Sequence, residues 1–278
     1  MPNPVLNEKT FEKAEAQAGW AAPAADTANA PLGAIPMTDG PSSPYTPYRP
    51  TTTEAMSRSG AYTATGVLLA VLLVGGVVGW LSVSESPTGD VNFPAWLLLP
   101  MFAALGVAIL LAFKPKLAMF LGPVYAILQG VVLGAISHVY EAQWDGIVLQ
   151  AIGITAAITV VMYLIYATGL IKVTDKTRKV IIGATLGVAL FYFVSIIISL
   201  FGVNVSYFES ASLWSIGLSV VIAGVAAFNL MLDFDLVDRG AAAGAPKYME
   251  WYAAFGLMVT VVWLYLEILR LLGKLNSR

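Results

Sequence analysis

The stretch Gly256–Leu272 reads Gly-Leu-Met-Val-Thr-Val-Val-Trp-Leu-Tyr-Leu-Glu-Ile-Leu-Arg-Leu-Leu and is apolar along almost its whole length. An apolar run approaching ~20 residues can cross the ~30 Å hydrocarbon core of a membrane as a helix. Within this run stands a carboxylate, Glu267, and a charged side chain at bilayer depth costs about 2.5 kcal/mol or more. So costly a residue indicates either a functional site or a structural charge that is paired with another.

The composition places the whole chain among membrane proteins. Of its 278 residues, 58% are hydrophobic and 12% are charged, whereas charged residues make up about 25% of a soluble domain. The net charge of −2 gives no indication of a nucleic-acid partner. The chain has no cysteine and a single histidine, His138, which excludes disulfides, thiolate nucleophiles and multi-histidine metal sites. We therefore expect no resident cofactor.

Residues 1–59 differ in composition from the rest of the chain. The part from 19 to 53 is rich in Ala, Pro, Thr and Ser, and such a segment cannot bury enough apolar surface to offset the entropy of ordering it. We predict a disordered cytoplasmic tail over 1–59 and a membrane domain over 60–278. The Pro/Tyr cluster at 41–50 could dock into a partner's aromatic groove as a polyproline helix, or the tail could be a simple tether. No apolar segment near Met1 resembles a signal peptide.

Seven apolar runs follow the tail. Because a backbone in lipid must satisfy its own hydrogen bonds, and the runs are continuous rather than alternating, they predict helices and an all-α integral membrane protein. Two runs carry glycines at four-residue spacing, Gly130 with Gly134 and Gly183 with Gly187, which favours close helix packing. The runs are approximately 61–83, 94–113, 118–139, 148–170, 179–202, 212–234 and 252–273.

Lysine and arginine alternate between the loops and predict the orientation. The loops at about 84–93, 140–147 and 203–211 contain neither residue, whereas the N-terminal flank and the other loops are basic. By the positive-inside rule the N-terminus is cytoplasmic. Seven crossings then place the C-terminus outside, although Arg270, Lys274 and Arg278 favour the inside. We expect the last run to cross the membrane; the alternative is a re-entrant segment.

Three acids, Asp233, Asp235 and Asp238, stand where the sixth run ends. Asp235 and Asp238 share a helix face at a spacing of three residues, whereas Asp233 points elsewhere. Acids at the C-terminal end of a helix oppose its dipole, so they need cations or protons nearby. One interpretation is an acidic helix end in contact with solvent and paired with Arg239; the other is one half of an intramembrane acidic site.

Glu267 also has two interpretations. Arg270 follows it by three residues, so the two could pair along one helix and neutralise each other. Alternatively, the carboxyl group faces the interior of the bundle, pairs with a second carboxyl group and shares a proton with it as a coupled unit. In that case, changing both acids should add little to changing one. Gln129, polar at mid-depth in the third run, could bond across helices or line a pore.

Three motifs together resemble the Bax inhibitor family, also called the transmembrane Bax-inhibitor-motif family. The run Leu264–Leu272 resembles the family's terminal helix, Phe234-Asp235-Leu236 its motif at the end of the sixth helix, and Tyr125–Ser137 its third helix. The resemblance covers about residues 60–275. It is strongest to the bacterial high-GC branch, whose members carry a disordered N-terminal tail.

The resemblance implies a seven-helix bundle with the last helix at its centre, in a bacterial plasma membrane. It also implies a pH-sensitive calcium leak in which Asp235 and Glu267 are the pH-sensing, ion-gating and metal-binding acids. Asp233, Asp238, Arg270 and Gln129 would support them. The sequence departs from the family at two positions, because Glu267 stands where most members have Asp and Gln129 where many have Glu.

The leading hypothesis is therefore a pH-sensitive channel that leaks a cation, Ca²⁺, and is gated by an intramembrane acid pair, since hard cations take carboxylate oxygens as ligands. The alternative, which the resemblance to bacterial relatives also allows, is a membrane regulator that conducts nothing and binds another membrane complex such as a membrane-bound protease. We expect no enzyme. The acids from Asp233 to Asp238 could hold magnesium diphosphate only with a second acidic cluster, and the sequence has none on the cytoplasmic side.

Overall fold

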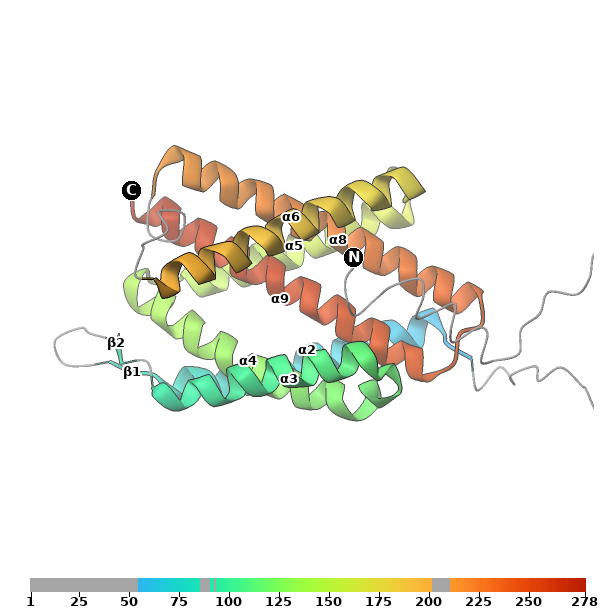
Figure 1. The fold of residues 1–278 in the computed structure, drawn as a ribbon, viewed down its shortest axis with the longest axis horizontal. Helices are drawn as coiled ribbons and strands as arrows, with labels where there is room; N and C mark the ends of the chain where they lie inside the picture. Colours follow the sequence, from blue (N-terminus) through green and yellow to red (C-terminus); the bar gives the residue numbers. More distant parts are fainter. Residues whose placement is uncertain (1–54, 86–90, 93, 202–210) are drawn as a thin grey trace, which may run out of the picture.

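The computed structural model describes residues 55–85, 91, 92, 94–201 and 211–278. Within these ranges seven helical segments are long and apolar enough to cross a membrane, and they correspond one for one to the seven predicted runs. They pack into a single elongated bundle (Figure 1). In chain order the elements are α2 (Arg58–Ser82), β1 (Ser84–Glu85), β2 (Val91–Asn92), η2 (Ala95–Leu97), α3 (Leu98–Phe113), η3 (Pro115–Leu117), α4 (Ala118–Gln143), α5 (Ile147–Ala167), α6 (Asp175–Leu200), α8 (Leu213–Ala242) and α9 (Tyr248–Asn276).

In the described part of the chain the paired strands form one small ribbon. Strands β1 and β2 pair antiparallel over two residues each, between α2 and η2. Everything else that would sit in the bilayer is helical, as the hydrogen-bonding demands of lipid require. The prediction of an all-α membrane bundle is confirmed.

The last helix, α9, occupies the centre of the bundle (Figure 1). It packs against α2, α4, α5 and α8. Seven consecutive residues, Tyr252–Met258, are all buried. Since seven residues make about two helical turns, α9 is surrounded on every side at this level. The central position that the family resemblance implied is therefore confirmed.

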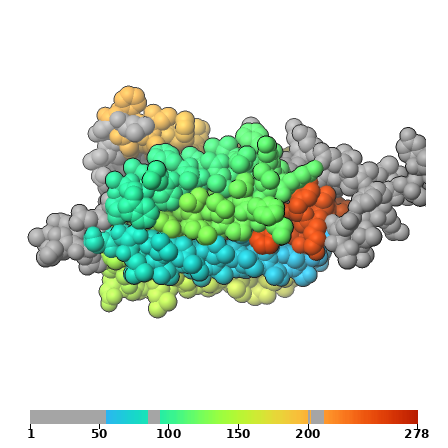
Figure 2. All heavy atoms as spheres, turned by 90° about the horizontal axis from the view of Figure 1, so that it is seen from below, coloured from blue at the N-terminus to red at the C-terminus, as the bar shows by residue number. Residues whose placement is uncertain are grey.

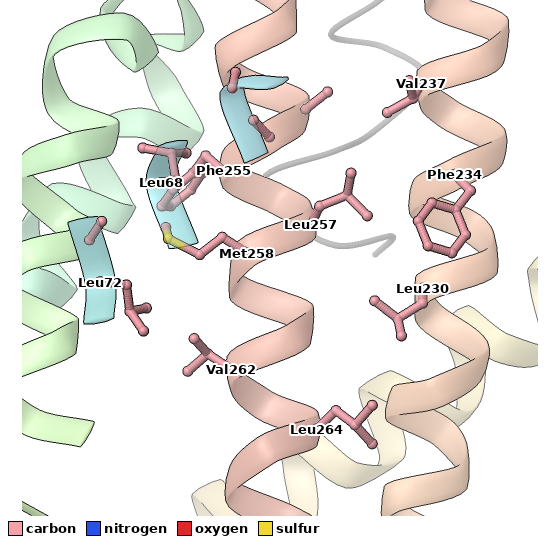
Figure 3. Close-up of a cluster of buried hydrophobic side chains, with 14 of the residues drawn as sticks. Leu68, Leu72, Leu230, Phe234, Val237, Phe255, Leu257, Met258, Val262 and Leu264 are labelled. Carbon is pink, nitrogen blue, oxygen red and sulfur yellow. The ribbon is translucent and has the colours of Figure 1, made fainter. Parts of the chain in front are cut away.

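The apolar core forms where α9 meets α2 and α8 (Figure 3). Phe255 and Met258 of α9 lie toward Leu68 of α2, while Leu257 and Leu264 lie toward the α8 side of the helix. The outer surface is also apolar. On the face made by α2, α3 and α4 (Figure 2), many large side chains such as Leu73 and Phe102 are exposed. An exposed apolar surface of this kind suits a lipid environment.

Glycines allow α2 and α4 to touch through their backbones. A Cβ atom on Gly134 would overlap the carbonyl of Gly76, and one on Gly79 would overlap the carbonyl of Val131. The packing role predicted for the Gly130–Gly134 pair is thus confirmed. Gly183 on α6 has nothing within 4 Å of its would-be Cβ, so the second glycine pair does not pack a helix in the described structure.

The last two helices differ from the predicted runs at their ends. Helix α8 continues eight residues past 234, to Ala242, and ends before Gly244, which takes the left-handed conformation at φ 69° that glycine tolerates best. Helix α9 is continuous over 29 residues, about 43 Å of rise. That length crosses a bilayer, so the expectation of a crossing holds and the re-entrant alternative does not.

Residues 55–57, inside the segment expected to be tail, pack against the bundle. Ala55 forms a β-bridge with Pro246, and Met56 is buried and donates its N–H to the Ala245 carbonyl at 2.6 Å. Ser57 caps α2, as serine commonly does at helix starts. The remainder of the predicted tail, residues 1–54, lies outside the described residues.

The start of α2 and the turns after α3, α5 and α8 lie at one end of the bundle, because successive helices run in opposite directions. Ion pairs between Arg58 and Asp238 and between Arg178 and Asp235 join three of these segments directly. We call this end the basic end. Its cations are Arg58, Lys114, Lys116, Lys172, Lys176, Arg178, Lys179, Arg239 and Lys247.

Candidate functional site

Asp235 lies at the basic end and binds two arginines. Its Oδ2 accepts from Nη2 of Arg178 on α6 at 2.8 Å, and it lies 3.1 Å from Nη2 of Arg239, one turn further along α8. The side chains of Asp235 and Arg178 are both 15% exposed. The first contact joins residues that are 57 positions apart in the sequence, so it fastens α6 to α8.

Asp238 has a separate set of partners. Its Oδ1 lies 3.0 Å from Nε of Arg58, and its Oδ2 accepts a hydrogen bond from the Tyr166 hydroxyl at 3.0 Å. The need for compensating cations is therefore met by Arg58 of α2 and Arg178 of α6 as well as by Arg239. Because α8 runs on to Ala242, Asp235 also stands about 10 Å from the helix end, where the helix dipole has little effect.

Asp233 is buried inside the bundle and is not the solvated residue that one interpretation expected. It is 3% exposed, and its Oδ2 accepts a hydrogen bond of 2.6 Å from the Thr260 hydroxyl on α9. The difference from Asp235 and Asp238 follows from helix geometry, since a residue two positions earlier than Asp235 lies on the opposite side of α8. That side faces the central helix.

Glu267 is almost completely buried, with 1% of its side chain exposed. Its Oε1 lies 2.8 Å from Nη1 of Arg270 and accepts a hydrogen bond from the Tyr192 hydroxyl of α6. Arg270 also donates to the same hydroxyl at 2.7 Å, and its guanidinium carbon lies 5.5 Å from the centre of the Tyr192 ring. Both interpretations of Glu267 thus describe part of the arrangement: it pairs with Arg270 and it faces the bundle interior.

Two contacts fix the register between α8 and α9. Asp233 lies beside Thr260 near the basic end, and Ser219 accepts a hydrogen bond of 2.9 Å from Lys274 at the other end. The two contacts are 14 residues apart on both helices. The helices therefore run antiparallel with one constant register between them.

This register separates the two acids that were expected to form a pair. Asp235 lies level with Met258 of α9, nine residues before Glu267, which corresponds to about 13 Å along the helix. A directly shared proton or cation requires oxygen atoms within a few ångströms. The structure instead gives Asp235 and Glu267 separate partners, each of which includes a side chain of α6.

The remaining predicted site residue, Gln129, lies on α4 and is half-buried. Helix α4 packs chiefly against α2, on the side of the bundle where the glycine contacts are. Within the described ranges, no group of three or more His, Asp or Glu side chains is placed to hold a metal ion. Calcium normally takes six to eight oxygen ligands, so a resident calcium site built on Asp235 and Glu267 does not match this geometry.

Sequence reasoning missed several buried polar residues. Asn229 of α8 donates to the Thr185 hydroxyl of α6 at 2.7 Å, and Lys274 is buried against Ser219. The signal on α8 was two pairs of polar residues at four-residue spacing on one face of the helix, Ser215 with Ser219 and Asn229 with Asp233. Lys274 and Arg270 turn inward, which also explains how a basic C-terminal segment can end on the side opposite the basic end.

The fold and the site define a class of protein: a multipass helical membrane protein with ion pairs buried between its last three spans. A family model described as Bax inhibitor 1 like matches residues 3–277. The chain therefore belongs to the Bax inhibitor 1 like family, as its motifs indicated. The match begins well before residue 60, where the resemblance drawn from the motifs begins. No curated protein sequence matched the chain.

Proposed function

We propose that this protein lets a cation, Ca²⁺, leak across the membrane in a pH-dependent manner, with Asp235 and Glu267 as the acids that control the leak. The observation that carries the proposal is the burial of Glu267, 1% exposed, within a membrane-spanning helix. It lies about 8 Å from the midpoint of α9, well inside a hydrocarbon core of ~30 Å. Intramembrane ionisable residues commonly mark ion pathways.

The partners of the two acids indicate how pH would act. Asp235 faces Arg178 and Arg239, and Glu267 faces Arg270 and the Tyr192 hydroxyl. These contacts are strong while the carboxylates are ionised and weaken when the carboxylates take up protons. The closed arrangement is therefore favoured at higher pH, and the calcium flux should rise as the pH falls.

The separation of the acids changes the expected mechanism from a shared proton to two independent contacts. Each carboxylate holds a side chain of α6, one near the basic end and one deeper in the membrane. Calcium is then a passing cargo that meets carboxylate and hydroxyl oxygens in turn, and no chemical reaction is involved. This matches transport, which needs sites weak enough for the ion to leave.

The proposal includes an orientation. The basic end, which carries the start of α2 and therefore the N-terminus, faces the cytoplasm by the positive-inside rule. The family resemblance suggests a bacterial plasma membrane. Asp235 would then lie near the cytoplasmic surface, and Glu267 would lie in the outer half of the bilayer.

The test is calcium flux into proteoliposomes, measured from neutral to acidic pH. Asp235→Asn and Glu267→Gln should each raise the flux at neutral pH and flatten its pH dependence. Asp145→Asn is the matched control, because Asp145 is an exposed acid at the other end of the bundle, and it should behave as wild type. A folded wild-type protein with no flux at any pH would overturn the channel and favour the regulator that binds another membrane complex.

A further inference from the structure

Helix α6 is attached to the bundle differently from the other spans. It packs chiefly against α8, and among its described side chains only Ile181 and Ser195 are buried. Large apolar residues such as Phe193, 62% exposed, cover its outer face. In Figure 1 α6 (gold) crosses α8 and α9 on the outside of the bundle. Little apolar packing therefore holds this helix in place.

Polar contacts attach α6 at three depths. Near the basic end Arg178 donates to Asp235 at 2.8 Å. In the middle, the Asn229 amide donates to the Thr185 hydroxyl at 2.7 Å. Further along, the Tyr192 hydroxyl binds Glu267.

The three α6 residues stand at a strict seven-residue spacing: Arg178, Thr185 and Tyr192. Seven residues fall about 20° short of two full turns, so all three lie on one face of the helix. They span about 21 Å of rise, which is most of the thickness of a hydrocarbon core. We call these three residues the polar stripe of α6.

The surface that the polar stripe covers is polar as well. It carries the Asp235 carboxylate and the Asn229 amide of α8 and the Glu267 carboxylate of α9. If α6 moved away, these groups would lose their α6 partners and be uncovered. Ionisable side chains at membrane depth face the interior of a bundle or a water-filled cavity, and α6 closes this part of the bundle.

We propose that α6 is the moving element of the gate and that its polar stripe holds it closed against α8 and α9. The inference rests on the proposed function and deepens it, because it names the part that moves. It also gives a role to Thr185 and Asn229, which act as the middle contact of the closed state. In lipid, helices associate through packing and hydrogen bonds without a hydrophobic driving force, so losing polar contacts is sufficient to release a helix that has few packing contacts.

The experiment measures distances between spin labels in the protein reconstituted in nanodiscs. The chain has no cysteine, so each label site is a single engineered residue. One pair joins Leu73→Cys on α2 to Phe193→Cys on α6; the control pair joins Leu73→Cys to Val220→Cys on α8. All three positions are exposed on the outer surface. The perturbation is Thr185→Val combined with Asn229→Leu, which removes the middle contact without touching either acid.

In the perturbed protein we expect a new population at a longer α2–α6 distance, by about 5 Å or half a helix diameter, with the α2–α8 distance unchanged. Calcium flux at neutral pH should rise severalfold in parallel. Thermal unfolding in the same nanodiscs checks that the bundle is intact.

The outcomes separate the two proposals. An unchanged α2–α6 distance, in a protein whose flux still responds to Asp235→Asn, would reject α6 as the gate and leave the proposed function standing. Equal shifts in both distances would show general loosening and would also reject it. Absence of flux from the wild type would overturn the proposed function, and with it the role of α6 as a gate.

Discussion

Removing the Glu267 carboxylate should destabilise the bundle chiefly because it takes the ion-pair partner away from Arg270. In Glu267→Gln the guanidinium keeps its hydrogen bond to the Tyr192 hydroxyl but loses its ion pair with the Glu267 carboxylate at 2.8 Å. The loss in free energy of unfolding depends on how much of the Arg270 side chain can reach water. Its side chain is 23% exposed, whereas that of Glu267 is 1% exposed.

Breaking a buried ion pair by removing one partner typically costs about 3–5 kcal/mol. The partial exposure of Arg270 allows some rehydration, so we expect about 2–3 kcal/mol for Glu267→Gln. Arg270→Gln should cost about 1–2 kcal/mol, since the Glu267 carboxylate keeps its hydrogen bond from the Tyr192 hydroxyl. Removing both charges should cost at most about 1 kcal/mol, because neither member of the pair is then left without the other.

The measurement is a double-mutant cycle on the free energy of unfolding, obtained by titrating the reconstituted protein with SDS in mixed micelles. Tyr192→Phe provides a reference, since it removes two interhelical hydrogen bonds, and one such bond in a membrane is worth about 0.6 kcal/mol. The reasoning is refuted if the double variant loses the sum of the two single losses. In that case Glu267 and Arg270 would contribute independently to the stability, and the coupling free energy of the ion pair would be zero.

Three further predictions concern the packing, the acids and the orientation. Gly134→Ala should cost about 1–3 kcal/mol because the added methyl group forces α2 away from α4. Gly183→Ala meets open space and should change the stability by less than about 1 kcal/mol. Thermal unfolding in detergent distinguishes the two variants. The losses in free energy of unfolding of Asp235→Asn and Glu267→Gln should add within about 0.5 kcal/mol, because sites ~13 Å apart without shared partners act independently. If the double variant is no less stable than the less stable single variant, the two acids are coupled, as the shared proton would require. A membrane-impermeant thiol reagent should leave Ala242→Cys unlabelled in intact cells, and rapid labelling from outside would reverse the orientation.

The sequence was sufficient for the helices because a single physical requirement governs them. Each run must be long and apolar enough to cross lipid, and that requirement can be read residue by residue without knowing any neighbour. The errors were at the ends, where the rule no longer applies. Helix α8 extends eight residues past the predicted end because Asp235 and Asp238 find cations on other helices, which makes a charged helical turn tolerable.

The candidate site was predictable only as a set of residue types. An acid in the last run and three acids after the sixth were visible as departures from apolar composition. Their partners were not, with two exceptions: Arg270 stands three residues from Glu267, and Arg239 four residues from Asp235, each pair on one helix. Local spacing reveals a contact within one helix, since neighbours at three or four positions share a face.

What the sequence alone determined is therefore the membrane class, the seven spans and the presence of costly acids at known depths. Only the tertiary structure decided that Asp235 pairs with Arg178, that Glu267 meets Tyr192, and that the two acids stand about 13 Å apart along α9. The physical reason is that partner choice between helices depends on which helices are neighbours and in what register they pack. Those are properties of the whole bundle, and no single helix encodes them.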